Sequence, residues 1–233
     1  MRIAVISDIH GNLTALEAVL KDINERGVDQ VINLGDLVFR GPYPSEVLAA
    51  LQDLKAPTLR GNTEDMLFQD WPAGDWRQEV AEWTRSVLSP DELAYLRGLP
   101  FSLRLELDDY KFLLVHASTR DNNQGFVAET PEEQLLELLG PPDHDALVAG
   151  HVHRQFLRRA AGRLLINPGA VGLPFDGDPR AAYCILDSAP GRLDVQLVRV
   201  AYDIDYAVGR AKKRVAWAGW FEATIRAGRL VKV

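Results

Sequence analysis

The sequence predicts an α/β fold in which short parallel strands alternate with helices. Apolar runs at residues 3–6 and 31–34 are each followed by a segment with apolar residues at helical spacing, 13–23 and 47–54. This alternation is typical of βαβ units. Both runs lead into an aspartate, and ligands bind at the carboxyl ends of strands in open α/β sheets. The fold class therefore indicates where a functional site should lie.

Local signals in the first hundred residues define the next elements. Asn12 is placed to cap the first helix and Gly27 to end it. A third strand is expected at residues 57–60. Segment 65–99 contains three tryptophans and a capping box that begins at Ser89, and we expect it to be a helical insert or lid over one edge of the site. Core packing is the simpler role for its tryptophans; a base-stacking or substrate wall is the alternative.

The second half of the chain predicts more strands and further helices. Alternation at residues 101–107 and the apolar run 112–115 indicate a hairpin. A capping box at Thr130 predicts the start of a helix, and the stretch from Tyr202 is expected to be helical and basic, without chemistry of its own. Strands are also expected at 146–149, 164–166, 182–186 and 193–200, the last two completing a second sheet.

Composition limits the class of protein. The 233 residues are 47% hydrophobic, enough for the core of a single domain spanning 1–233. The net charge of −7 argues against general nucleic-acid binding, but not against a small anionic substrate held by metal. Cys184 is the only cysteine, no leader pattern is visible, and no stretch approaches the ~20 apolar residues of a membrane span. We expect a cytoplasmic protein without a membrane partner, and leave its oligomeric state open.

Metal-capable side chains follow five of the expected strands. Four of the five histidines lie at these points, whereas the fifth, His144, is expected to be exposed. Carboxylates, a carboxamide and imidazoles suit Mn²⁺, Fe, Zn²⁺ or Ni²⁺ better than Mg²⁺ or Ca²⁺. Seven side chains suit two ions, which in phosphatases lie roughly 3.5–4 Å apart. The expected ligands are Asp8, His10, Asp36, Asn62, His116, His151 and His153, with Asp36 as the bridge.

These residues carry a family resemblance. The ordered motifs Asp8-x-His10, Gly35-Asp36, Gly61-Asn62, His116 and Gly150-His151-x-His153 resemble the signature of the calcineurin-like metallophosphoesterases over roughly residues 1–190. The resemblance implies a four-layer αββα sandwich of two mixed sheets flanked by helices. It also implies one metal held by Asp8, His10, Asp36 and His153, and a second held by Asp36, Asn62, His116 and His151.

The resemblance also implies an activity. Asn167-Pro168-Gly169 and the following Gly177–Arg180 segment are similar to a small bacterial branch of phosphodiesterases and asymmetric dinucleoside tetraphosphate hydrolases. We expect a metallophosphoesterase that hydrolyses phosphodiester or phosphoanhydride bonds of small, nucleotide-like substrates by attack of a metal-bridging hydroxide. Two Mn²⁺ ions are favoured, with Fe, Ni²⁺ or Zn²⁺ as alternatives, and Asp36, Asn62 and His116 are the expected catalytic residues. A protein Ser/Thr or phosphomonoester phosphatase, or a non-catalytic scaffold like a retromer subunit of this fold, are the alternatives.

Four further residues are candidates for substrate binding. Many relatives have a histidine, thought to protonate the leaving oxygen, where this chain has Thr63. Its absence predicts a preference for activated leaving groups or diesters over alkyl monoesters. Arg40 resembles a phosphate-contacting arginine of protein phosphatases, although a surface arginine in a turn is the alternative. Arg120 and Asn122 are weaker candidates that also suit an ordinary loop.

Overall fold

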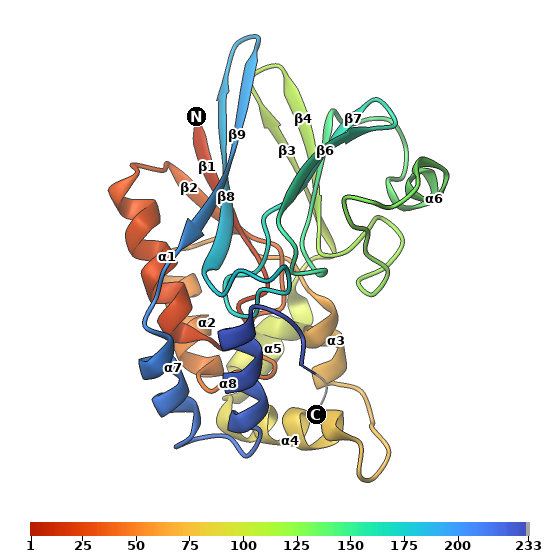
Figure 1. Ribbon diagram of the computed structural model, residues 1–233. Helices are drawn as coiled ribbons and strands as arrows, with labels where there is room; N and C mark the ends of the chain where they lie inside the picture. Colours follow the sequence, from red (N-terminus) through yellow and green to blue (C-terminus); the bar gives the residue numbers. More distant parts are fainter. Residues whose placement is uncertain (232–233) are drawn as a thin grey trace.

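Two mixed β-sheets pack face to face in the computed structural model, which describes residues 1–231 (Figure 1). One sheet has the order β2-β1-β8-β9 and the other β3-β4-β5-β7-β6. The first comprises β1 (Arg2–Ile6), β2 (Gln30–Asn33), β8 (Ala181–Ala189) and β9 (Arg192–Val200). The second comprises β3 (Ser102–Leu107), β4 (Tyr110–Val115), β5 (Ala146–Ala149), β6 (Phe156–Ala160) and β7 (Arg163–Asn167).

Helices cover the outer faces of this pair of sheets and one end of it (Figure 1). The segment expected as a helical insert forms α3, α4 and α5, which lie at the same end of the molecule as α8. Its role as a lid stays a prediction. The helices are α1 (Leu13–Glu25), α2 (Pro44–Asp53), α3 (Asn62–Leu67), α4 (Trp76–Val87), α5 (Pro90–Gly98), α6 (Glu132–Leu138), α7 (Ile204–Ala211) and α8 (Ala218–Ala227).

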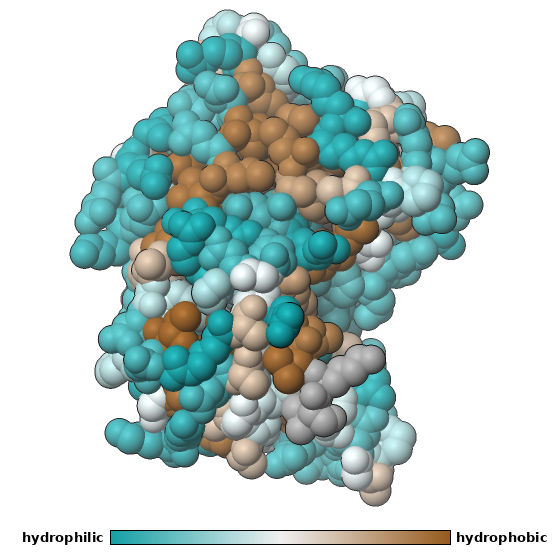
Figure 2. Space-filling model, in the orientation of Figure 1, coloured by the Kyte–Doolittle hydropathy of each residue, from teal (hydrophilic) through white to brown (hydrophobic). Residues whose placement is uncertain are grey.

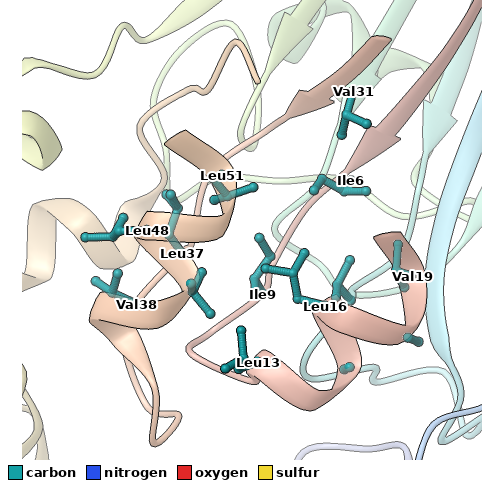
Figure 3. Packing of buried hydrophobic residues seen from close by; sticks show 14 of the residues in the cluster. Ile6, Ile9, Leu13, Leu16, Val19, Val31, Leu37, Val38, Leu48 and Leu51 are labelled. Atoms are coloured by element: carbon teal, nitrogen blue, oxygen red, sulfur yellow. The ribbon is translucent and has the colours of Figure 1, made fainter. Parts of the chain in front are cut away.

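The strand alternation distributes β1 between two hydrophobic cores. Ile3 and Val5 face the other sheet, where they join a cluster with Phe112 of β4. Ala4 and Ile6 face outward and pack with α1 and α2. Figure 3 shows this outer core, in which side chains of α1 and α2 meet the strand ends of β1 and β2. A fully buried aliphatic side chain contributes roughly 1.5–3 kcal/mol. The expected α/β sandwich of two mixed sheets is confirmed.

Several local expectations are also confirmed. The Asn12 side chain accepts a hydrogen bond from the Ala15 N–H at 3.2 Å and caps α1, while Gly27 follows the helix with a φ of 63°. The capping box of Ser89 and Glu92 opens α5. No helix within residues 1–231 has the length and apolar character to cross a membrane.

The predicted strand assignment was partly wrong. β8 and β9 were expected to complete the second sheet, but β8 pairs antiparallel with β1 in the first. β6 was not expected at all. Residues 57–60 form only one bridge, between Asn33 and Thr58, because Arg60 donates to the carbonyl of Pro100 and turns away from β2. Pairing between distant segments decides these points, and side-chain alternation does not encode it.

Two residue-level expectations were also wrong. The capping box at Thr130 does not form: its hydroxyl accepts from the N–H of Val127, and Pro131 is the N-cap of α6. His144 was expected to be exposed but is 5% exposed, with its Nε2 3.3 Å from Nη1 of Arg163. The contact with the buried Arg163 on β7 therefore accounts for the burial of this loop histidine.

Candidate metal centre

The polar residues that follow the parallel strands converge at one edge of the two sheets. β1 and β2 are parallel, as are β4 and β5, so their carboxyl ends point the same way. The side chains of Asp8, Asp36 and His116, which follow β1, β2 and β4, are buried. The loop after β5 brings His151 and His153 to the same place, and Asn62 reaches it from the start of α3.

The backbone adopts unusual conformations at these positions. Five of the seven expected ligands have positive φ angles although none is a glycine. Such conformations cost of order 1–3 kcal/mol each and cluster at functional sites. The neighbouring glycines are required by close approach, since a Cβ on Gly61 would collide with the carboxylate of Asp36, and one on Gly150 with Ser7. The five residues are Asp8, His10, Asp36, His151 and His153.

One group of four side chains is compact enough for a single ion. Asp8, His10, Asp36 and His153 each offer one ligand atom, and these atoms lie within 4.8 Å of one another. The Nε2 atoms of His10 and His153 are 3.2 Å apart. Oδ1 of Asp8 is 3.2 Å from Nε2 of His153, and Oδ2 of Asp36 is 3.4 Å from Nε2 of His10.

A second group shares Asp36 with the first. Oδ1 of Asn62 lies 2.9 Å from Nε2 of His116 and 2.9 Å from Nδ1 of His151. Oδ1 of Asp36 lies 3.4 Å from Nε2 of His116. The two oxygens of one carboxylate thus face two different groups of donors. The structure brings together all seven side chains that the sequence analysis singled out.

Backbone carbonyls fix the orientation of three of the imidazoles. Nδ1 of His10 is 3.0 Å from the carbonyl of Phe39, and Nδ1 of His116 is 3.0 Å from that of Leu34. Nδ1 of His153 faces the carbonyl of Leu173 in the same way. A ring nitrogen that faces a carbonyl must carry its proton, so each Nε2 presents a lone pair to the centre.

This arrangement fits divalent cations. Two lone-pair nitrogens, on His10 and His153, face one another, and the buried Oδ1 of Asp8 has no hydrogen-bond partner among residues 1–231. A cation between these atoms would satisfy all of them. Burial lowers the pKa of His10 to about 3, which keeps its imidazole neutral as a metal ligand requires. Burial would raise the pKa of Asp8, but the adjacent histidines outweigh it and leave the pKa lowered.

Glu64 supports this centre, although the sequence analysis gave it no role. Its fully buried carboxylate accepts the N–H groups of Asp36 at 2.9 Å, Leu37 at 2.8 Å and Gly61 at 2.8 Å. Burial and the nearby Asp36 charge raise the pKa of Glu64 to about 7. The available signal was an acid two residues after Asn62, which resembles the acid that follows the family's Gly-Asn motif.

Asn167 supports the loop after β5. Its Nδ2 donates to the carbonyl of Gly150 at 2.8 Å, and its Oδ1 accepts from the N–H of Gly169 at 2.9 Å. The Asn167-Pro168-Gly169 motif therefore fixes the segment that leads into His151 and His153.

The four substrate-binding candidates lie in different settings. Thr63 is 1% exposed, its N–H donates to Oδ1 of Asp36 at 2.9 Å, and its hydroxyl has no partner within the described residues. Asn122 donates to Asp65 of α3 at 3.2 Å. Arg120 pairs with Glu137 on α6 at 3.0 Å, and both side chains are largely exposed. Substrate contact by these three residues stays a prediction.

Arg40 occupies the most distinctive of these settings. Its guanidinium carbon lies 5.1 Å from the centre of the Trp76 ring and 5.4 Å from that of Trp220. Its side chain has no hydrogen bond or ion pair within residues 1–231, and its φ is 84°. Burial lowers the pKa of Arg40, and the carboxylates of Asp36 and Asp8 partly offset this. Arg40 therefore faces the negative charge of Asp36 and Asp8 without a direct partner among the described residues.

Two mixed sheets with buried carboxylates and imidazoles at their strand ends define a metal-dependent hydrolase fold. Comparison with known families identifies which group of such proteins this chain belongs to. The chain belongs to the calcineurin-like phosphoesterase superfamily, whose domain model matches residues 1–190. The prediction of a phosphoesterase is confirmed at this level.

Individual relatives agree with this assignment. A metallophosphoesterase structure from Sphaerobacter thermophilus superposes with a TM-score of 0.80 at 30% identity, covering 98% of this chain and 99% of that one. The phosphodiesterase YfcE of Escherichia coli is 26% identical, over 81% of this chain and 88% of YfcE. Serine/threonine-protein phosphatase 2 of Escherichia coli K12 is 25% identical, over 71% of this chain and 86% of its own length.

Proposed function

We propose that this protein is a dinuclear-metal phosphoesterase that hydrolyses phosphodiester or phosphoanhydride bonds of small, nucleotide-like substrates. The observation that carries the proposal is the position of Asp36 between the two donor groups. Its two carboxylate oxygens each lie 3.4 Å from an imidazole Nε2, one on His10 and the other on His116. A single carboxylate in this position suits a bridging ligand.

The proposed ligand sets follow from the two groups. Asp8, His10, Asp36 and His153 would hold one ion. Asp36, Asn62, His116 and His151 would hold the second. Mixed imidazole and oxygen donors favour Mn²⁺, with Fe, Ni²⁺ and Zn²⁺ as alternatives. When bound, such ions lower the pKa of a coordinated water and neutralise the charge that develops on a phosphoryl group.

The chain's own residues would position the substrate against this centre. The N–H of Thr63 and the carboxylate of Glu64 hold the side chain and backbone of Asp36 in place. Arg40 offers a planar set of donors to the phosphate oxygens. The hydroxyl of Thr63 cannot act as an imidazole acid would, so the proposal favours leaving groups that depart with little protonation.

We further propose that the protein is cytoplasmic and that its binding partner is a small phosphorylated substrate. Support for a reducing compartment comes from Cys184, the only cysteine, which is fully buried. Burial raises the pKa of its thiol to about 12, so this residue is protected rather than reactive.

A protein Ser/Thr phosphatase is the second candidate, because Arg40 follows Gly35-Asp36 at the spacing of that class and one relative carries that name. Steady-state turnover by the Mn²⁺-loaded protein distinguishes the two. The substrates are an aryl phosphodiester, an aryl phosphomonoester and diadenosine tetraphosphate. We expect the diester or the dinucleotide to exceed the monoester by at least tenfold in kcat/KM. A monoester preference would favour the phosphatase, and turnover of none would reject both.

A further inference from the structure

A cavity of ≈ 690 Å³ lies between α4 and α8, next to Arg40. Its walls are mostly apolar and aromatic. Figure 2 shows apolar surface in the region of α8. Cavities of roughly 300–1,000 Å³ with aromatic walls and few polar groups are typical of small-molecule sites. Its lining includes Arg40, Trp76, Glu79, Trp217 and Trp220.

Two consecutive residues, Phe39 and Arg40, contact both the metal centre and the wall of the cavity. The carbonyl of Phe39 accepts the hydrogen bond from His10, while the Phe39 ring meets Trp76 edge-on at 6.3 Å. The carbonyl of the next residue, Arg40, accepts the N–H of Trp217 at 2.5 Å. The same loop thus orients a ligand imidazole on one side and forms the tryptophan wall on the other.

Arg40 has no anionic partner among residues 1–231. Its buried Nε has no hydrogen-bond partner within residues 1–231, and two indole rings flank the guanidinium. A planar guanidinium held in this way is preorganised for bidentate hydrogen bonding to an anion such as a phosphate. Among the described residues, the other charged group in the lining is Glu79, a carboxylate that can accept hydrogen bonds from ring N–H groups.

We propose that the Arg40–tryptophan cavity is a binding subsite for a planar aromatic ring carried on the phosphate ester substrate. Arg40 binds the phosphate end, and Trp76 and Trp220 provide stacking faces for the ring. This rests on the proposed function and names its substrate class, an aromatic phosphate ester. Two sources share that chemistry: a nucleobase of a nucleotide and a simple aryl ester. Trp217 and Trp220 lie outside the residues that the family model matches.

Binding tests this subsite without relying on turnover. The Mn²⁺-loaded protein is titrated by calorimetry with AMP, phenyl phosphate and ribose 5-phosphate, of which only the last lacks an aromatic ring. We expect AMP and phenyl phosphate to bind at least tenfold more tightly than ribose 5-phosphate, in the range that base stacking supplies. Tighter binding of AMP than of phenyl phosphate identifies a nucleobase site, and equal affinity identifies a general aryl site.

Variants locate the effect. Trp76→Leu should reduce the preference for AMP to less than threefold, and Trp76→Phe should retain most of it because a ring remains. Trp71→Leu is the matched control, since Trp71 belongs to the same segment but bonds to Met66 and does not line the cavity. Equal affinity of all three ligands for the wild-type protein overturns the proposal, as does an equal loss in both leucine variants. If the preference is present but no phosphoester is hydrolysed, the subsite stands and the proposed function fails.

Discussion

The carboxylate of Glu64 accepts the backbone N–H of Asp36 at 2.9 Å, so a fully buried acid holds the residue that lies between the two donor groups. The same carboxylate also accepts from Leu37 and Gly61, and thereby ties the loop after β2 to the start of α3. This contact connects the backbone of two separate segments to the geometry of the site. Glu64 is therefore a positioning residue, since it acts through Asp36.

Replacing Glu64 should weaken metal binding. Glu64→Gln keeps the size of the side chain but replaces one acceptor oxygen by an NH₂ group that faces backbone donors. We expect a roughly 10- to 100-fold loss in Mn²⁺ affinity, as is common for groups that support metal ligands. Calorimetric titration of the metal-free protein measures this. Glu106→Gln, at an exposed position of β3, is the control, and an equal change in both variants would contradict the assigned role.

Metal stoichiometry should separate the bridge from the other ligands. We expect two ions per chain in the wild-type protein after Mn²⁺ loading, about one in His151→Ala, and less than one in Asp36→Asn. The reason is that Asp36 faces both groups, whereas the His151 ring lies with Asn62 and His116 in the second group. Elemental analysis of dialysed protein gives the counts. One ion in the wild-type protein would reject the dinuclear proposal, and less than one ion per chain would favour a scaffold.

Removal of metal should lower thermal stability. The centre holds buried carboxylates and facing lone-pair nitrogens that a cation would compensate. At a hundredfold excess of ion over its Kd, linkage supplies about 2.7 kcal/mol per site. This corresponds to a fall in Tm of about 5–10 °C per site in a chelator. Calorimetric scans of Asp36→Asn should show a much smaller effect of the chelator, and an unchanged wild-type Tm would argue against native binding.

The sequence predicted that these seven side chains lie together, but it did not predict the pairing of β8 with β1, for a physical reason. Asp8 and Asp36 each follow a short apolar run, and parallel strands place their carboxyl ends at one edge of the sheet, so local pattern alone brings these two residues together. The partner of β1 on its other side is β8, more than 170 residues later, and no local signal encodes that pairing. The burial of His144 likewise depends on Arg163 of another strand.

The tryptophans were the hardest feature to interpret from sequence. Trp76 lies in the segment whose rings were expected mainly to pack in a core, and Trp220 in a C-terminal stretch with no expected chemistry. The structure places both beside Arg40, on α4 and α8. Only tertiary packing brings these helices together, so helical periodicity could not reveal the cavity between them.

Substitution of Thr63 should change the range of leaving groups. In Thr63→His the backbone N–H that orients Asp36 is retained, while an imidazole is added beside the centre. We expect turnover of an alkyl phosphomonoester to rise at least tenfold, because proton donation to a poor leaving group contributes roughly 10²–10⁴ in rate. Turnover of an aryl diester should not change. Thr63→Val tests the hydroxyl separately. If Thr63→His changes the turnover of neither substrate, this explanation is wrong.

Arg40 should affect substrate affinity far more than metal binding. Arg40→Ala removes the guanidinium between Trp76 and Trp220 but no expected ligand, so two ions per chain should remain. We expect KM for an aryl phosphodiester to rise at least tenfold with little change in kcat, because the guanidinium binds phosphate in the ground state and transition state alike. Arg40→Lys keeps the charge but loses the planar fork and should recover only part of the affinity. An unchanged KM with full metal content would show that this buried cation serves only to pack the tryptophans.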